Sequence, residues 1–321
     1  FETISGFTTT GASILSDVEA LSHCSLFWRS FTHWIGGMGV FVFLLAILPL
    51  TGGYNMHLMR AESPGPSVGK LVPKVKTTAM ILYGIYVIFT VIEIIALLIA
   101  GMPLFDSMTL TFGTVGTGGF GLLNSSIASY STAVQIIITV FMIICSINFT
   151  VYYMFLIKRP KEALMCEEMR YYLLIVFGSA LLIAFNIRAS FASFGKAFQQ
   201  AIFQVASVIS TTGFATADFN LWPEFSRMIL VLLMFVGACA GSTGGGFKVS
   251  RLIIMVKSVR NEIMSVTHPR SVQKVHMDGR RIPDNVVKTV LCYLAGYVVI
   301  LIVSVLLISL DNFDMTTNFA A

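Results

Sequence analysis

The segment Thr8-Thr9-Thr10-Gly11-Ala12 has two counterparts further along the 321-residue chain. They read Val115-Gly116-Thr117-Gly118-Gly119-Phe120 and Ser210-Thr211-Thr212-Gly213-Phe214. Alignment of Gly11, Gly119 and Gly213 gives intervals of 108 and 94 residues. A short amphipathic stretch, too short or too polar to cross a bilayer, precedes each segment, at residues 1–7, 104–112 and 194–208. This recurrence predicts an internal repeat of one structural unit.

The rest of the chain has the composition of a membrane protein. Hydrophobic residues make up 56% and charged residues only 12%, and the mean hydropathy is +0.83. A soluble domain carries about 25% charged residues. The composition therefore excludes a cytosolic enzyme and a disordered chain. It also excludes a nucleic-acid-binding protein, because the net charge of +5 comes from few ionisable groups.

Six apolar segments are long enough to cross a membrane as helices. They lie at residues 27–50, 77–100, 133–157, 171–187, 228–255 and 286–310. The fourth is short, so we expect its helix to begin earlier. A short helix followed at once by a Thr/Gly segment is typical of a re-entrant helix and loop.

Lysine and arginine residues give the orientation. If the spans alternate and the re-entrant segments return to their own side, one side holds all but four of the 21 Lys and Arg residues. The exceptions are Arg29, Arg188, Lys196 and Arg227. The positive-inside rule makes the basic side cytoplasmic, so the Thr/Gly segments open to the outside.

Irregular backbone is tolerated at membrane depth only where it is buried in protein or lines a watery path. Glycine permits positive φ, and rings of carbonyl oxygens replace the hydration shell of potassium in channel filters. Close helix packing through small residues is the alternative for any one such loop. Three loops at a regular interval favour an ion pathway. The predicted ion-binding residues are Thr8, Thr9, Thr10, Gly11, Thr114, Val115, Gly116, Thr117, Gly118, Gly119, Ser210, Thr211, Thr212 and Gly213. Potassium itself is expected at Thr9, Thr10, Gly118, Thr211 and Thr212, with sodium possible and no covalently bound cofactor.

A further Gly-rich stretch at residues 237–246 interrupts the span at 228–255. No opening helix separates it from Gly213, so it is not a fourth repeat of the loop. Lys248 stands out of register for a nucleotide-binding P-loop. Because glycine is unfavourable inside helices, we expect the helix to break here, with tight packing of small residues as the alternative.

These motifs resemble the Trk/Ktr/HKT superfamily of cation transporters, and its Trk membrane subunits most closely. The resemblance covers nearly the whole chain. The residues that carry it are 5–12, 34–39, 46–49, 60–66, 118–120 and 212–214.

The resemblance implies an all-α transmembrane fold with pseudo-fourfold, potassium-channel-like M1–P–M2 repeats around a central pore. It implies potassium uptake across the plasma (inner) membrane of a bacterium or archaeon, by a homodimer in membrane lipid with a cytosolic nucleotide-binding regulatory ring (RCK/TrkA-type). It implies no nucleic-acid partner. It also implies an intramembrane gate beneath the filter, at Gly241, Ser242, Thr243, Gly244, Gly245 and Gly246.

We expect the chain to be cut at both ends and to lack the fourth filter. The repeat divides the chain into seven segments. They are the end of repeat 1 (1–51), a cytoplasmic linker (52–76), repeat 2 (77–157), a linker (158–170), repeat 3 with a broken M2 (171–257), a linker (258–285) and the first helix of repeat 4 (286–321).

A secondary transporter that couples sodium or protons to an organic solute is the alternative function. It would show two inverted halves, whereas these repeats run in one direction. Glu93 within the second span is either functional or hydrogen-bonded to a pore helix. Asp17, Glu19 and Asp218 either concentrate cations at the outer mouth or are merely solvated. The histidines show no metal-ligand spacing, and no residue cluster indicates an enzyme.

Overall fold

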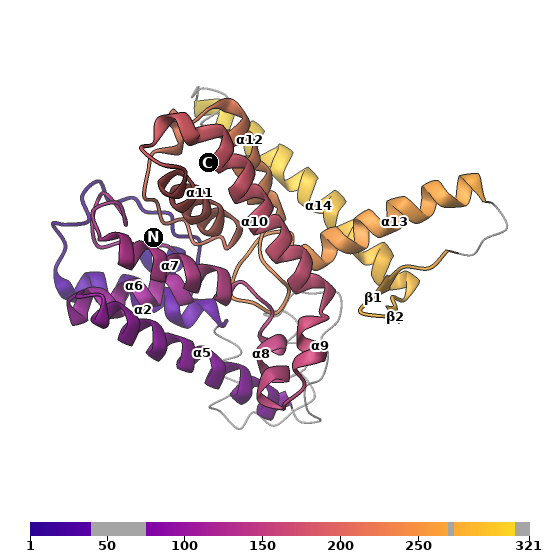
Figure 1. Ribbon diagram of the computed structural model, residues 1–321, viewed down its shortest axis with the longest axis horizontal. Helices are drawn as coiled ribbons and strands as arrows, with labels where there is room; N and C mark the ends of the chain where they lie inside the picture. The colour runs from indigo at the N-terminus through magenta and orange to yellow at the C-terminus, as the bar shows by residue number, and fades with distance from the viewer. Residues whose placement is uncertain (40–74, 269–272, 312–321) are drawn as a thin grey trace. The chain divides into compact units, whose positions relative to one another are not determined.

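The computed structural model describes residues 1–39, 75–268 and 273–311. It consists of two units, residues 1–250 and 251–321, which we describe separately. Helices account for almost all of the secondary structure in the described ranges, as the ribbon in Figure 1 shows. This confirms the all-α fold class.

The described part of the first unit is built from helices. They are α1 Glu2–Phe7, α2 His23–Gly37, α5 Val75–Ile99, α6 Leu104–Val115, α7 Thr132–Cys145, α8 Phe149–Leu156, α9 Pro160–Leu164, α10 Glu167–Ile187, α11 Phe194–Ile209 and α12 Glu224–Val236, with the 3-10 turns η1 Arg188–Ser190 and η2 Phe219–Leu221. Serine side chains cap the starts of α2, α7 and α11, where an acceptor satisfies a free amide. Helix α10 begins before residue 171, as expected.

Within the described part of the chain, three helices are long and apolar enough to cross a membrane. They occupy residues 79–99, 167–190 and 284–308, and the pair α7 and α8 would make a fourth span. Helix α2 begins the span expected at 27–50. The remainder of that span and most of the expected linker at 52–76 lie outside the described residues.

The span expected at 133–157 is broken in the structure, because α7 and α8 meet at an angle of 88°. The Asn148 side chain caps α8 by accepting the Thr150 amide at 2.9 Å. The Phe149 amide donates to the carbonyl of Gly241, and the Ser146 carbonyl accepts the amide of Cys239, both at 3.0 Å. The Gly-rich stretch thus satisfies backbone groups that the bend releases, which removes the main cost of breaking a helix.

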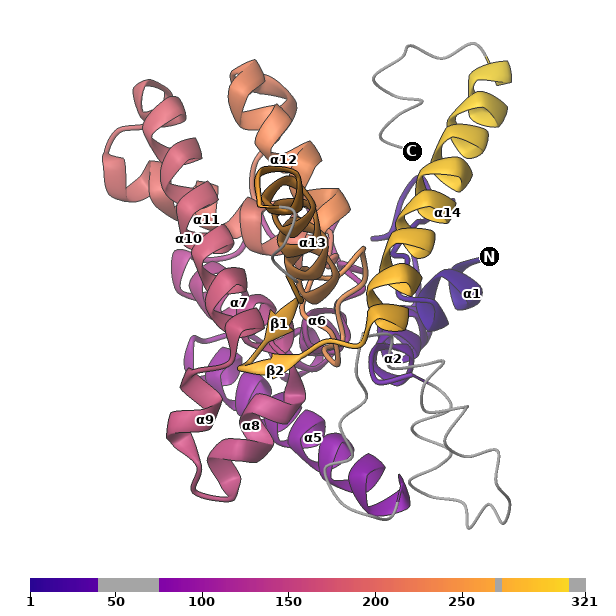
Figure 2. The ribbon, with the colours of Figure 1, turned by 90° about the vertical axis from the view of Figure 1, so that its right-hand side faces the viewer.

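The two short helices α6 and α11 have equivalent neighbours. Helix α6 packs against α5 before it, α7 after it, and α2 of the preceding repeat; α11 packs against α10, α12 and α7 in the same way. Figure 2 shows α10 and α11 side by side. Because each short helix lies between the two longer helices of its own repeat and one from the repeat before, the arrangement matches M1–P–M2 units placed around an axis.

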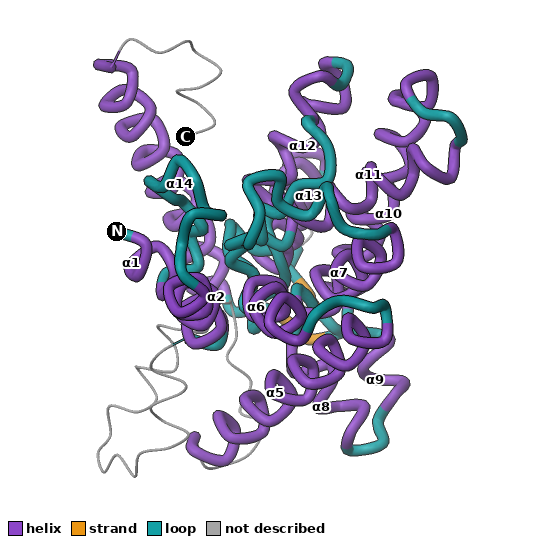
Figure 3. The backbone as a smooth tube through the Cα atoms, turned by 90° about the vertical axis from the view of Figure 1, so that its left-hand side faces the viewer, coloured by secondary structure: helices purple, strands orange, loops and turns teal. Residues whose placement is uncertain are grey.

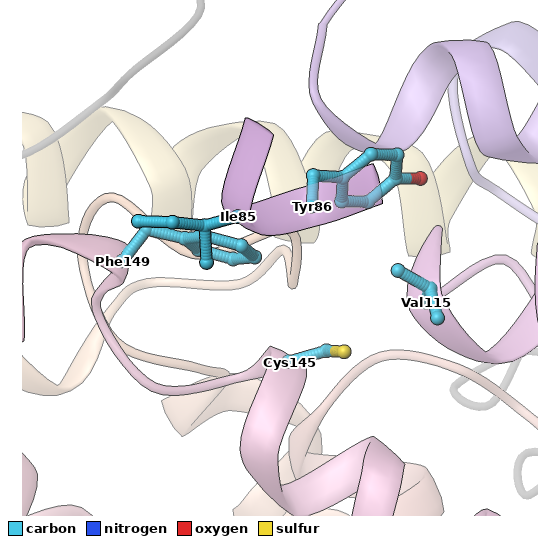
Figure 4. Packing of buried hydrophobic residues seen from close by; sticks show 5 residues of the cluster. All are labelled: Ile85, Tyr86, Val115, Cys145 and Phe149. Atoms are coloured by element: carbon cyan, nitrogen blue, oxygen red, sulfur yellow. The ribbon is translucent and has the colours of Figure 1, made fainter. Parts of the chain in front are cut away.

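Figure 4 shows a buried cluster that fixes the end of α6. It consists of Ile85, Tyr86, Val115, Cys145 and Phe149, from α5, α6, α7 and α8. The Tyr86 hydroxyl also donates to the Trp34 carbonyl of α2 at 2.7 Å. Close packing of these side chains anchors the point from which the second Thr/Gly loop begins.

The second unit, together with the end of the first, holds α13 Val249–Thr267, β1 His276–Met277, β2 Arg280–Arg281, α14 Asp284–Ile308 and η3 Ser309–Asp311. The two strands pair antiparallel with His276 opposite Arg281. Asp278 and Gly279 connect them, both with positive φ, which is the signature of a tight hairpin turn. The Asp284 carboxylate accepts bonds from Lys274 at 3.0 Å and Arg281 at 3.4 Å, which ties the hairpin to the start of α14.

Candidate ion-binding loops

The loops after α1, α6 and α11 repeat one backbone conformation. Three equivalent threonines, Thr9, Thr117 and Thr211, have φ of 53°, 53° and 60°. The glycine two residues after each, at positions 11, 119 and 213, has φ of 74°, 79° and 87°. Left-handed φ costs a β-branched residue roughly 1–2 kcal/mol. Its occurrence at three equivalent positions is typical of a functional site. The alignment by glycines therefore also aligns the backbone.

Amide groups of each loop bond back to the helix before it. In the second loop Thr117 donates to Thr114, and the amides of Gly118 and Gly119 donate to the Gly113 carbonyl, at 2.9–3.3 Å. The third loop repeats all three bonds, from Thr211 to Val208 and from Thr212 and Gly213 to Ser207; the first repeats two, from Thr9 to Gly6 and from Thr10 to Ser5. The backbone carbonyls at the helix ends are thereby satisfied.

This bonding directs the loop carbonyls away from the helices, because the N–H and C=O of a trans peptide point in opposite directions. The C-terminal end of each helix, with its partial negative charge, lies directly behind the loop. Carbonyl oxygens backed by such helix ends suit a monovalent cation. Figure 3 shows these loops as teal segments at the ends of α1, α6 and α11.

Successive loops touch at their glycines. A Cβ at Gly11 would overlap the Gly118 carbonyl, and a Cβ at Gly119 would overlap the Thr212 carbonyl. Gly118 and Thr212 stand at the same position of their loops, so the same contact joins the first loop to the second and the second to the third. A Cβ at Gly213 would meet no atom within 4 Å among the described residues.

Polar groups join the segments that follow the first and second loops. The Asn124 amide donates to Asp17 at 2.8 Å, and its oxygen accepts the Val18 amide at 2.9 Å. Glu19 accepts the backbone amide of Asn124 at 3.0 Å. The bonds that Asp17 accepts from Asn124 and from the Glu19 amide lower the pKa of its carboxyl. Asp218, the third acid considered for the outer mouth, caps η2.

The loops share a backbone conformation, but the side-chain hydrogen bonds that stabilise them differ. Hydroxyl pairs join Thr8 to Thr10 at 2.8 Å and Ser210 to Thr212 at 2.6 Å, whereas the second loop has Gly116 and Gly118 at these positions. Among the predicted ion-binding residues, Thr114 and Val115 belong to the last turn of α6. The Thr114 hydroxyl donates to Leu110 at 2.8 Å, and Val115 lies in the apolar cluster. Both residues therefore belong to the helix that carries the second loop rather than to the loop itself.

The Gly-rich stretch breaks the helix as expected: α12 ends at Val236 and α13 begins at Val249. It lies directly against the third loop, where the Gly245 amide donates to the Thr211 hydroxyl at 2.7 Å. A Cβ at Gly244 would lie 2.8 Å from the Ser210 carbonyl. The Lys248 ammonium donates to the Gly244 carbonyl within the stretch.

One buried carboxylate joins this stretch to the start of the helix that follows it. Oε1 of Glu168 in α10, whose residue is 3% exposed, accepts the amides of Ala240 at 2.7 Å and Ser250 at 3.1 Å. Sequence reasoning missed Glu168 because its position at the start of a span resembles that of a solvated acid. Only its contact with a segment far along the chain reveals the role.

Two buried titratable residues, Glu93 and His33, lie near the second loop. Glu93 is fully buried in α5, and its carboxyl group faces Thr114 of the short helix α6. His33 is also fully buried, against the second loop. Within the described ranges, no three His, Cys, Asp or Glu side chains group as metal ligands.

Comparison with known proteins identifies the family. The TrkH family model, described as a cation transport protein, matches residues 1–321. The chain belongs to the TrkH family. It is 36% identical over 329 residues to the Trk system potassium uptake protein TrkH of Salmonella typhimurium, covering all of this chain and 68% of that protein. It is 32% identical to TrkG of Escherichia coli, covering all of this chain and 67% of the relative.

A solved structure agrees with this assignment. The crystal structure of the potassium transporter TrkH from Vibrio parahaemolyticus superposes with a TM-score of 0.86 at 32% identity, covering 99% of this chain and 66% of that one. The chain thus spans about two thirds of the length of its TrkH relatives. Membership of the TrkH family makes it an integral membrane transport protein rather than a member of an enzyme class, and it confirms the predicted family and M1–P–M2 fold.

Proposed function

We propose that this chain is the pore-forming part of a potassium uptake protein of the bacterial or archaeal plasma membrane. The observation that supports this best is the threefold repetition of one loop conformation. In each loop a left-handed threonine precedes a left-handed glycine, and the loop amides are tied back to a short helix. The ion is proposed to be potassium because relatives carry the name Trk system potassium uptake protein.

The ion is proposed to pass between the loop carbonyls at residues 8–11, 116–119 and 210–213. Carbonyl and threonine oxygens there replace water of hydration, and the helix ends behind them stabilise the charge. Among the described residues, no atom lies where a Cβ of Gly213 would stand. A fourth loop is proposed to contact Gly213 there, as the Thr212 carbonyl contacts Gly119. Such a loop would close the pseudo-fourfold ring.

The test is growth of a cell that lacks potassium uptake. The full-length protein should restore growth at low potassium and take up potassium or rubidium. An organic solute that is taken up in its place, with sodium or protons, would contradict the proposal and favour a coupled secondary transporter.

The Gly-rich stretch at residues 237–246 is proposed to gate the pathway. Its contacts with Thr211 and Ser210 support a position beside the inner end of the third loop. Glycines 237, 241 and 246 have positive φ, so the segment has conformations that other residues rarely adopt. Shortening this stretch should raise cation flux at equal amounts of protein in the membrane, and unchanged flux would contradict a gate.

Two partners belong to the proposal: a second copy of the membrane subunit, and a cytosolic nucleotide-binding ring that contacts the basic cytoplasmic segments. The run from Lys257 to Arg281 carries many of those basic residues and could also contact anionic lipid. Cross-linking in native membranes, followed by mass measurement, would test both partners.

A further inference from the structure

The second loop lacks a support that the other two loops possess. In the first loop the Ser5 hydroxyl donates to the Ala12 carbonyl at 2.6 Å, and in the third the Ser207 hydroxyl donates to the Phe214 carbonyl at 2.6 Å. Both serines lie on the short helix that precedes their loop. The equivalent residue of α6 is Gly113, so Phe120, which follows the second loop's glycine, has no serine to hold its backbone.

His33 of α2 contacts the same residue, but it binds the backbone amide rather than the carbonyl. The Phe120 amide donates to Nδ1 of His33 at 3.4 Å, and the two rings stack with centroids 4.0 Å apart and planes 22° apart. A Cβ at position 118 would overlap the imidazole ring, so the ring fills the space that a side chain takes in the other loops. His33 thereby holds Phe120 through its backbone amide, whereas the serines of the other loops hold the equivalent residue through its carbonyl, and the His33 ring fills the space of the threonine side chain.

A charged pair extends the support to the first repeat. The Arg29 guanidinium, one turn before His33, lies 4.1 Å from the centre of the Phe120 ring. Arg29 is paired at 2.7 Å with Glu2 of α1, and the two side chains are only 6% and 18% exposed. The backbone of the second loop is therefore fixed to the helix that follows the first loop, and through it to α1.

The histidine is particular to this one helix. It lies eleven residues after the N-cap Ser22. The residues eleven positions after the N-caps Ser131 of α7 and Pro223 of α12 are Met142 and Met234. A methionine would fill space at this position but would offer the Phe120 amide only a weak acceptor.

We propose that His33 is a positioning residue for the second loop, and that by holding Phe120 and Gly118 it helps to set the ion preference of the pore. This inference rests on the proposed potassium pathway. The Gly118 carbonyl faces Gly11, so a shift of the second loop changes the distance between oxygens that bind the ion. Preference between cations of different size depends on that spacing and on the number of oxygens.

The experiment compares variants of the full-length protein in an uptake-deficient cell, by competition of potassium and sodium for rubidium uptake. His33→Phe keeps a ring of similar size and removes the acceptor, whereas His33→Asn keeps an acceptor near the Nδ1 position. Loss of one net hydrogen bond corresponds to about a fivefold change. Because the ion preference cannot change by more than the bond contributes, His33→Phe should reduce the preference for potassium over sodium by up to about fivefold, and His33→Asn should retain most of it.

A transplanted serine provides the rescue. His33→Ala should lose the preference, and His33→Ala with Gly113→Ser should recover part of it. The new hydroxyl would start from a Cβ 3.3 Å from the Phe120 carbonyl, with the Phe214 ring edge yielding slightly. His23→Phe, the same substitution at the exposed start of α2, serves as the control and should leave ion preference unchanged.

The outcomes separate the two proposals. A wild-type protein that takes up no potassium or rubidium contradicts the proposed function. An active wild-type protein whose ion preference is the same in His33→Phe and His33→Ala contradicts the positioning role of His33. If these variants lower only the amount of protein in the membrane or the maximal uptake, His33 is a packing residue and the inference is wrong.

Discussion

Gly119 shows how far a single residue constrains the candidate pathway. Its φ of 79° is unfavourable for any residue with a Cβ, and an added Cβ would overlap the Thr212 carbonyl. Gly119→Ala should therefore reduce rubidium uptake by about tenfold or more, since ~1.4 kcal/mol of strain already corresponds to a factor of ten.

Gly101, in the turn between α5 and α6, supplies the matched control for that substitution. Its φ is 87°, but a Cβ there would meet open space. Gly101→Ala should cost a similar backbone strain and leave most uptake intact. Equal loss of uptake in the two alanine variants would show that strain alone is responsible, and would contradict a role for the contact with Thr212.

Asp17 leads to a prediction about how the stability of the protein depends on pH. Hydrogen bonds from Asn124 and the Glu19 amide lower its pKa below the ordinary 3.8. A carboxyl with a lowered folded pKa stabilises the folded state above its unfolded pKa, and this contribution is lost as the pH falls through the folded value. Asn124→Ala should therefore lower the thermal midpoint slightly at pH 6, and the difference from wild type should shrink below pH 3.8. A difference that stays constant with pH would contradict this linkage.

At the scale of elements, the Gly-rich stretch depends on one anchor. The Glu168 carboxylate accepts two buried amides, from Ala240 and Ser250. Glu168→Ala would leave both unpaired, at about 1–3 kcal/mol each. The variant should lower the thermal midpoint and, if the stretch is the proposed gate, raise basal cation flux. Glu168→Gln keeps an acceptor oxygen and should lie nearer to wild type in both measurements. Reduced stability with unaltered flux would separate the anchor from gating.

The elements also show where sequence reasoning succeeds and fails. Helices α5, α10 and α14 lie within a few residues of their predicted bounds because apolar runs of that length have one stable state in a bilayer. The bend at Asn148 could not be predicted, because it depends on backbone bonds to residues 239 and 241, far along the chain. The hairpin at residues 276–281 could have been predicted from its Asp-Gly turn.

Within the candidate site, the backbone conformation of the loops could be predicted from the sequence better than the side chains that hold them. Glycine spacing aligned the three loops, since positive φ leaves a direct trace in the sequence. The role of His33 left no such trace, because it arises only where α2 meets Gly118 and Phe120. Thr114 and Val115 looked like loop residues but belong to α6, because a helix end shifts by one or two residues without a sequence signal.

At the scale of the whole molecule, the proposed pathway joins unequal repeats. The first and third loops carry hydroxyl pairs and serine supports, whereas the second is held by a histidine from another helix. Four identical loops would place their oxygens at equal distances from the axis; unequal supports do not enforce this. Selectivity for potassium over sodium should therefore be weaker than in a symmetric potassium channel. Competition between the two ions for uptake by the full-length protein measures this directly. Comparable affinities would support the argument, and near-absolute exclusion of sodium would show that the shared backbone conformation alone defines the oxygen positions.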